Sequence, residues 1–291
     1  MKKRNNVFTL LMLGLPTLML ILVSFYPLIR SLIMSFTNYN VLRPNQDVSF
    51  VGAENYSKFF DDTRSFPSLS FSLIYAFFCV SFSYIIGLGL ALLMNAPIKL
   101  RAFFRALILL PWAIPTVVAT ANWLWILNDQ VGFVNVVLQE IGLIDSPIMF
   151  IANPVMARIT CIIVGTWKSY PFMALSLLAG LQSIPDELYE SARMDGAGSF
   201  RCFWNITLPL LKNVSAVIIT MMFIWGFNNF DIIYLLTQGG PLESTYTLPI
   251  YTYNIAFYRG QMGYASAVSM ITLVILLAFC LVYMKVQKLE D

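Results

Sequence analysis

Two charged side chains interrupt the apolar runs of this 291-residue chain, and they indicate where chemistry could occur. Lys168 lies within the apolar run 159–184, and Asp231 lies near the end of the run 213–236. A charged group is costly inside a bilayer, so it normally faces a cavity or pairs with another charge. Lys168 and Asp231 are therefore predicted either to contact a solute or to form a structural polar pair.

Aromatic, amide and hydroxyl side chains accompany these two charges. They are Trp112, Thr116, Trp167, Ser169, Tyr170, Phe172, Trp225, Asn228 and Asn229. Aromatic faces can stack on the C–H faces of sugars, and the polar groups can hydrogen-bond ring hydroxyls. Pro111, Pro115 and Pro171 interrupt helical hydrogen bonding at similar depth, as is common in spans that line a cavity. The cluster predicts a site for a hydroxyl-rich solute, although packing or interfacial belts would use the same aromatic residues.

The composition indicates the environment of these residues. Hydrophobic residues make up 58% of the chain and charged residues 11%, whereas a soluble domain carries about a quarter charged residues. We therefore predict an all-α, polytopic membrane protein. The chain has no histidine, which is the commonest metal ligand and proton relay, so neither a metal site nor a catalytic site is predicted. The four cysteines are expected to be small buried hydrophobic residues.

Six apolar runs are long enough to cross a bilayer core, which takes about 20 helical residues. The predicted spans are residues 7–29, 69–96, 106–128, 159–184, 213–236 and 260–284. The first is expected to be a retained span, because its apolar run is too long for a signal peptide and no cleavage site follows. No internal repeat or linker divides the chain, so residues 1–291 are predicted to form a single transmembrane domain.

The distribution of lysine and arginine predicts the orientation. With the N-terminus inside, eleven of the eighteen basic residues fall in cytoplasmic segments and five fall outside, while Arg158 and Lys168 belong to the fourth span. Because cytoplasmic loops carry the excess of positive charge, we expect both termini to lie in the cytoplasm. A bacterial inner or plasma membrane protein with several spans is predicted. The same orientation makes residues 185–209 cytoplasmic.

A polar segment separates the fourth and fifth predicted spans and has the sequence PDELYESARMDGAGSFRCFWNITLP, residues 185–209. Its spacing is E-x-A-x₃-G-x₉-I-x-L-P, formed by Glu190, Ala192, Gly196, Ile206, Leu208 and Pro209. This spacing resembles the cytoplasmic EAA loop with which permease subunits of bacterial ABC importers contact their ATPase subunits. Ser191 stands where the middle alanine would be. An interfacial amphipathic helix would explain the polarity of the segment but not this spacing.

Local signals within this segment predict a short helix, a break and a second helix. Ser183 can cap the first helix, and Pro185 suits its first turn. Asp195 and Gly196 are expected to end it, with Gly196 in a left-handed conformation. The resemblance implies that this helix contacts the ATPase through a charged residue, small side chains and the turn. The implied coupling residues are Glu190, Ser191, Ala192, Asp195 and Gly196.

The resemblance extends over nearly the whole chain. Residues 50–56, FVGAENY, resemble the F-x-G-x-x-N-Y element that follows the first span of sugar permeases. Residues 105–115, RALILLPWAIP, are similar to their third-span entry, and residues 227–241, FNNFDIIYLLTQGGP, to their fifth-span exit. The chain is thus identified as a member of the carbohydrate ABC importer permeases, in the maltose/glycerol-phosphate-type, first-subunit branch. This implies the type I ABC importer permease fold, with six transmembrane helices.

The resemblance also implies a substrate path. The sugar contacts of the maltose-type subunit align with Trp112, Thr116, Gly165, Lys168, Ser169, Phe172, Met222, Gly226 and Asn229. Gly165 and Gly226 are smaller than the amides of the family, and Met222 replaces a hydroxyl. The aligned positions therefore imply a roomier site or a different ligand.

An ATP-driven importer of a carbohydrate or oligosaccharide is the function that the resemblance implies. The chain would form a heterodimer with a sister permease, together with two ATPase subunits and an extracytoplasmic solute-binding protein. It lacks the G-x₄-G-K-[ST] phosphate loop, so the partner ATPase is expected to bind ATP and magnesium. No bound cofactor, enzymatic activity or nucleic-acid partner is expected of this chain.

Other readings remain open at this point. Lys168 could attract a phosphate or carboxylate, so a glycerol-phosphate, polyol or acidic-sugar permease is an alternative. A secondary transporter could use Lys168 and Asp231 for ion coupling, but it would be expected to contain internal repeats. A membrane enzyme would require a catalytic constellation. A permease for amino acids or metals would not explain the matches at residues 50–56 and 227–241.

Overall fold

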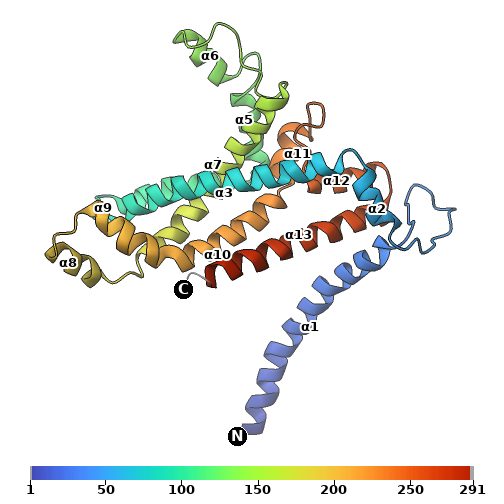
Figure 1. Ribbon diagram of the computed structural model, residues 1–291, viewed down its shortest axis with the longest axis horizontal. Helices are drawn as coiled ribbons and strands as arrows, with labels where there is room; N and C mark the ends of the chain where they lie inside the picture. Colours follow the sequence, from blue (N-terminus) through green and yellow to red (C-terminus); the bar gives the residue numbers. More distant parts are fainter. Residues whose placement is uncertain (1, 289–291) are drawn as a thin grey trace. The chain divides into compact units, whose positions relative to one another are not determined.

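The computed structural model describes residues 2–288, and the regular elements of these residues are helices joined by loops (Figure 1). The chain divides into two compact units. One comprises Met1–Phe66 and Tyr251–Leu277, and the other comprises Pro67–Ile250 and Ala278–Asp291. The single transmembrane domain expected from the sequence stays a prediction.

Five segments of the described residues are long and apolar enough to cross a membrane. They belong to α1 (Lys2–Ser35), α3 (Ser65–Asn95), α7 (Pro154–Leu181), the segment Ser199–Thr237 and α13 (Met262–Lys288). A sixth candidate consists of α4 (Arg101–Ala113) and α5 (Thr116–Ile126), which are bent by 90° at the break between them. Each of the six predicted spans overlaps one of these segments, and the all-α fold class is confirmed.

The other helices are short except for α10, which has 20 residues. They are α2 (Glu54–Asp61), α6 (Phe133–Glu140), α8 (Asp186–Met194), α9 (Ser199–Cys202), α10 (Leu208–Phe227), α11 (Asp231–Thr237) and α12 (Leu248–Tyr253), with π-helical turns η1 (Phe203–Thr207) and η2 (Asn254–Tyr258). Of these, α9, η1, α10 and α11 make up the segment Ser199–Thr237. A π-turn widens a helix locally and often occurs at functional sites.

Pro115 explains the break in the third span. Proline has no N–H, so the carbonyl of Pro111, four residues earlier, loses the donor that an unbroken helix would supply. The residue before a proline is also pushed towards an extended conformation, and Ile114 has φ −67° and ψ 132°. The interruption predicted at Pro115 is therefore confirmed. Pro111 and Pro171, in contrast, lie inside α4 and α7, so the helix breaks expected at these two residues are not formed.

In the first unit, the element at residues 50–56 completes the end of α1. The Asn55 side-chain amide donates hydrogen bonds to the carbonyl oxygens of Ser35 and Thr37, at 2.9 and 2.8 Å. The Tyr56 hydroxyl lies 2.7 Å from Ser35 Oγ. Carbonyls at the end of a helix have no partner within it, so Asn55 supplies one of the donors they need. The asparagine and tyrosine of this sugar-permease element have a structural role.

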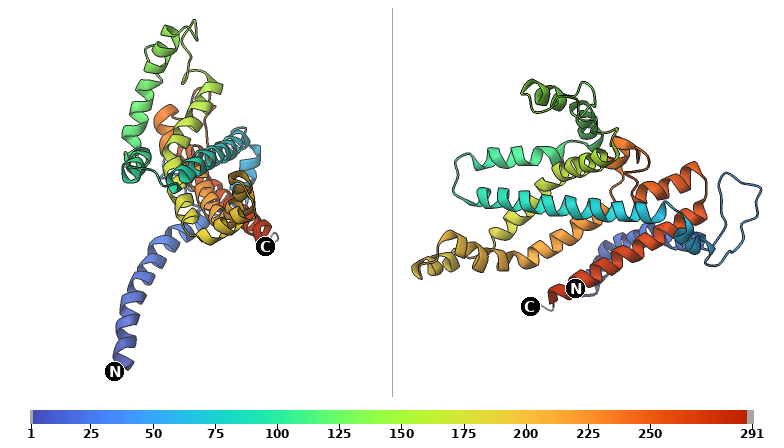
Figure 2. Two further views of the ribbon diagram at one scale, coloured as in Figure 1. Left: turned by 90° about the vertical axis from the view of Figure 1, so that its left-hand side faces the viewer. Right: turned by 45° about the horizontal axis from the view of Figure 1, so that its top comes forward.

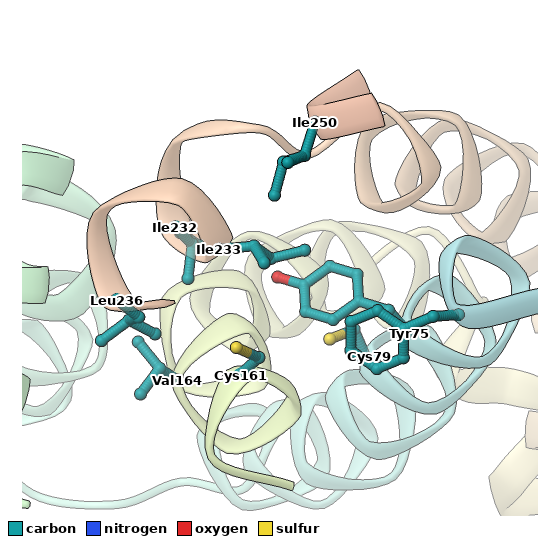
Figure 3. Close-up of a cluster of buried hydrophobic side chains, with 9 residues drawn as sticks. Tyr75, Cys79, Cys161, Val164, Ile232, Ile233, Leu236 and Ile250 are labelled. Atoms are coloured by element: carbon teal, nitrogen blue, oxygen red, sulfur yellow. The ribbon is translucent and has the colours of Figure 1, made fainter. Parts of the chain in front are cut away.

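In the second unit, a buried cluster joins α3, α7, α11 and α12. Its members are Phe71, Tyr75, Cys79, Cys161, Val164, Ile232, Ile233, Leu236 and Ile250. Figure 3 shows the Tyr75 ring next to Cys79, with side chains of α7 and α11 around it. Cys79 and Cys161 are buried here, as predicted. The cluster fixes α11 against α3 and α7, and this arrangement forms one wall of the site described next.

Candidate functional site

A cavity of about 290 Å³ lies within the second unit, lined by residues of α3, α4, α5, α7, α10 and α11 together with the break before α11. Eight of the nine residues in the predicted substrate path line it: Trp112, Thr116, Lys168, Ser169, Phe172, Met222, Gly226 and Asn229. Asp231 and Trp225 line it as well. Helices far apart in the sequence thus bring these side chains together, while their contact with a substrate stays a prediction.

Three aromatic rings from three helices form one side of the cavity. The ring centroids of Trp112 and Phe172 are 6.3 Å apart, and those of Phe172 and Trp225 are 5.2 Å apart. Trp112 is 54% exposed and Trp225 is 50% exposed. About half of each indole is therefore available to stack on a ligand or on another protein chain.

Lys168 directs its ammonium group at the broken span. Its Nζ donates hydrogen bonds to the carbonyls of Pro111 at 3.0 Å and Trp112 at 3.2 Å, and a third to the carbonyl of Ile114. These carbonyls lie at or just beyond the end of α4, where backbone acceptors lack helical donors and the helix dipole favours a cation. Lys168 from α7 therefore caps α4, whose end Pro115 leaves open.

The predicted polar pair between Lys168 and Asp231 is not formed in this structure. An ammonium group has three N–H donors, and those of Lys168 are directed to three backbone carbonyls. Asp231 is exposed in the first turn of α11 and lines the same cavity. The donors of Lys168 serve instead the carbonyls that the interrupted span leaves without helical partners.

Asn229 has a local role in addition to its place in the cavity wall. Its side-chain oxygen accepts a hydrogen bond from the backbone N–H of Ile232 at 3.3 Å. This bond supplies a partner for one of the unpaired N–H groups at the start of α11. The amide NH₂ group of Asn229 is the part that remains able to donate to a ligand.

Gly165, the ninth residue of the predicted path, is buried rather than in the cavity lining. A Cβ atom at this position would overlap the Tyr75 hydroxyl and lie 2.9 Å from Cys79 Sγ. The space left by this glycine is therefore filled by α3, so Gly165 does not make the cavity roomier. Gly226 lines the cavity but also faces α3, because an added Cβ would lie 3.3 Å from Ala76 Cα.

The second span contributes residues that sequence reasoning missed. Tyr75, Cys79 and Val80 of α3 line the cavity. Tyr75 is one of several polar residues in the run 69–96, and no motif distinguished it from the others. Met222, predicted from the resemblance, is buried and lines the cavity as an apolar side chain.

Helix α8, which carries most of the predicted coupling residues, is exposed and contributes no residue to the cavity lining. No residue of α8 is buried, and Figures 1 and 2 show α8 at the end of α10 opposite α11. Glu190 and Ser191 are exposed, and Ala192 is half-buried. The predicted coupling residues thus lie together on a short helix and its turn, away from Asp231.

A defined turn ends α8. Gly196 has φ +81°, and the predicted left-handed conformation is confirmed. The N–H of Gly196 donates to the carbonyl of Arg193 at 3.0 Å, and the N–H of Ala197 donates to the carbonyl of Ala192 at 2.9 Å. This pair of bonds is the Schellman arrangement, which favours glycine at the left-handed position.

The start of α8 differs from the prediction. The Ser183 hydroxyl donates to the carbonyl of Gly180 at 2.7 Å, so it serves the end of α7 and does not cap α8. Pro185 directly precedes the helix. Helix α8 also contacts the fifth span: the Tyr189 hydroxyl lies 3.0 Å from Thr207 Oγ1 in η1.

The described residues thus combine helices of membrane length with a cavity and an exposed polar helix. Residues 83–290 match the family described as binding-protein-dependent transport system inner membrane component, and the chain belongs to this family.

Two relatives illustrate the similarity. The chain is 39% identical to the trehalose/maltose transport system permease protein MalF of Thermococcus litoralis, over 82% of this chain and 80% of the relative. It is 34% identical to the sulfoquinovosyl glycerol transport system permease protein SmoG of Agrobacterium fabrum, over 99% of this chain and 92% of the relative.

A solved structure has a similar fold. It belongs to a bacterial ABC transporter involved in the import of the acidic polysaccharide alginate, with a TM-score of 0.84 and 24% identity. The similarity covers 98% of this chain and 96% of that chain. The predicted ABC importer permease fold is thereby confirmed.

Proposed function

We propose that this chain is a permease subunit of an ATP-driven carbohydrate importer and forms part of its translocation path. The observation that carries the proposal is the convergence of Trp112, Phe172 and Trp225 with hydroxyl and amide groups in one cavity. Aromatic rings beside groups that both donate and accept hydrogen bonds suit a solute with apolar faces and many hydroxyls. The trehalose/maltose and sulfoquinovosyl glycerol systems of the relatives support the same class of substrate.

The proposed assembly contains a sister permease, two ATPase subunits and an extracytoplasmic solute-binding protein. One coupling segment can serve one ATPase, so a second ATPase requires a second permease. The half-exposed indoles of Trp112 and Trp225 leave the cavity open for residues of that permease. Since this chain lacks the phosphate loop, the ATPase subunits bind ATP and magnesium, and this subunit has no enzymatic activity of its own.

Coupling is proposed to pass from α8 to the cavity along the fifth span. The acidic residues of α8 and its exposed surface suit a complementary cleft on the ATPase. The bond between Tyr189 and Thr207 connects α8 to η1, which continues directly into α10. Met222 and Trp225 of α10 line the cavity. A displacement of α8 therefore has a direct mechanical route to the substrate path.

The coupling function requires α8 to face the cytoplasm of the cell. The positive-inside distribution supports this orientation, with both termini in the cytoplasm. A cysteine introduced in place of exposed Ser191 should react with a membrane-impermeant thiol reagent only when the reagent is supplied from the cytoplasmic side. Labelling from the outside of intact cells would contradict the orientation.

Reconstitution with candidate partner subunits tests the whole proposal. Sugar-loaded binding protein should stimulate ATP hydrolysis by the complex and drive sugar uptake into vesicles. Trp112→Ala and Trp225→Ala should lower uptake, because each removes a half-exposed ring from the cavity. Trp125→Ala is the matched control, since Trp125 is 79% exposed on α5 outside the cavity lining. Unchanged uptake by both cavity variants would indicate that this chain does not contact the sugar.

A further inference from the structure

We infer that the cavity selects carbohydrates without a negative charge, and that Asp231 is the residue of this chain that sets this preference. The inference rests on the proposed carbohydrate function and concerns the class of sugar, which the relatives leave open. Among the residues that line the cavity, Lys168 is the one cation and Asp231 is the one anion. The selectivity depends on which of these two a solute can contact.

Lys168 has no hydrogen bond left for an anionic solute. Its three N–H donors are directed to the carbonyls of Pro111, Trp112 and Ile114. A substrate carboxylate would have to displace these bonds and leave carbonyls at the end of α4 without donors. Carbonyls at the end of a helix need a donor from elsewhere, so the exchange gains an anionic solute little. The structure therefore uses the positive charge of Lys168 to hold the broken span rather than to bind a ligand.

Asp231 offers the opposite kind of contact. Its side chain is exposed in the cavity wall, and an ionised carboxylate only accepts hydrogen bonds. Sugar hydroxyls and ammonium groups can donate to it, whereas a substrate carboxylate or phosphate cannot. Asn229, whose oxygen is used by Ile232, supplies N–H donors nearby. A neutral polyol can satisfy both residues at once, because each hydroxyl both donates and accepts.

The aromatic side of the cavity strengthens this preference. A charged group that leaves water for a site beside Phe172 and Trp225 needs a direct counter-charge, because burial of an unpaired charge is strongly unfavourable. The N–H donors of Lys168 are directed to backbone carbonyls, so it offers no direct hydrogen-bonded ion pair, and Asp231 would repel an anion. Neutral sugars lose no comparable hydration energy when they enter.

A direct binding experiment tests whether the cavity prefers neutral sugars to anionic ones. The full complex, in lipid nanodiscs and without its binding protein, is titrated with maltose, with glucuronosyl-glucose and with glucosaminyl-glucose. Saturation-transfer NMR reports the affinity of each probe. Omitting the binding protein keeps its own selectivity out of the measurement. We expect the acidic probe to bind about tenfold more weakly than maltose, the order expected for like charges several ångström apart in a partly hydrated site. The amino probe should bind at least as tightly as maltose.

Single substitutions then test which residue sets the preference for neutral over acidic sugars. Asp231→Asn should bring the affinities for the acidic and neutral probes close together, whereas Asp145→Asn, in the exposed loop before α7, should leave their ratio unchanged. Lys168→Met should weaken the binding of both probes to the same extent. The substitution removes hydrogen bonds that hold the cavity wall in place, but it removes no contact with the ligand. Lys168→Arg, which keeps the charge and the donors, should restore binding.

Three results would overturn the inference alone: an acidic probe that binds as tightly as maltose, a Lys168→Met variant that loses the acidic probe selectively, or an Asp231→Asn variant with an unchanged probe ratio. Failure of all three sugars to bind would instead overturn the proposed carbohydrate function, and the inference with it. An unchanged probe ratio in Asp231→Asn would show that another residue sets the preference.

Discussion

In the cavity, Lys168 donates hydrogen bonds to the backbone of its own unit and Asn229 accepts one from it, whereas Glu190 and Ser191 on α8 are exposed to solvent. The difference follows from the surroundings of each region. Carbonyls at the end of a helix lack partners within it, and Lys168 supplies donors to those of α4. The exposed side chains of α8 have no such role within the subunit. The polar groups at the break are therefore paired within this chain, while the surface of α8 is available to a second protein.

The largest expected effect concerns the turn that ends α8. Gly196→Val should abolish coupled transport, because a β-branched residue is strongly disfavoured at φ +81°. Gly196→Asn is the matched variant, since asparagine tolerates the left-handed conformation while adding bulk. If the turn alone matters, Asn should retain transport; if another protein approaches closely, both variants should fail. Sugar uptake and ATPase co-purification measure the outcome.

An added Cβ at Gly196 would find no atom of this chain within 4 Å. Loss of ATPase binding by Gly196→Asn would therefore report a contact with a partner rather than a clash within the subunit. Normal transport by Gly196→Val would contradict the coupling role of this segment. A Glu190→Lys variant, which reverses a charge on the exposed helix, should weaken ATPase binding while the subunit still inserts in the membrane.

The second prediction concerns Lys168 in the cavity. Lys168→Met removes the charged donor that the part-buried and exposed carbonyls at the break share, and a hydrogen bond to a charged group contributes about 1.5–3 kcal/mol. We expect the purified complex to unfold at a clearly lower temperature, whereas Lys168→Arg should unfold close to the unsubstituted protein. A Lys168→Met complex of unchanged stability would show that the bonds to the break are dispensable.

The third prediction tests the packing behind the cavity. Gly165→Ala places a methyl group against Tyr75 and Cys79, and overpacking of this kind costs about 1–3 kcal/mol. The variant should be less stable, and the double variant with Tyr75→Phe should recover part of the loss, because the nearest atom is removed. Higher sugar affinity in Gly165→Ala without loss of stability would contradict the burial of Gly165.

The same contrast explains what could be predicted from the sequence. Some signals that act between near neighbours were interpreted correctly, since Pro115 breaks the third span and Gly196 takes the left-handed conformation, whereas the expected cap at Ser183 was wrong. The partners of Lys168 could not be predicted, because they lie 54–57 residues away and become accessible only through the packing of α4 against α7. Tyr75 was missed for the same reason, since only the absence of a side chain at Gly165 lets α3 approach.

The smallest expected effect concerns the contact between Tyr189 of α8 and Thr207 of η1, which connects the coupling helix to the fifth span. Tyr189→Phe removes the hydroxyl that lies 3.0 Å from Thr207 Oγ1, and a single neutral hydrogen bond contributes about 0.5–1.5 kcal/mol. Tyr84→Phe is the matched control, because Tyr84 makes a similar 3.0 Å contact with Ser215 of α10 but does not touch α8. If α8 transmits motion through this contact, Tyr189→Phe should hydrolyse more ATP for each sugar transported, while Tyr84→Phe should keep the original ratio. An equal ratio in both variants would mean that the chain connection through α9 and η1 transmits the motion without the hydroxyl contact.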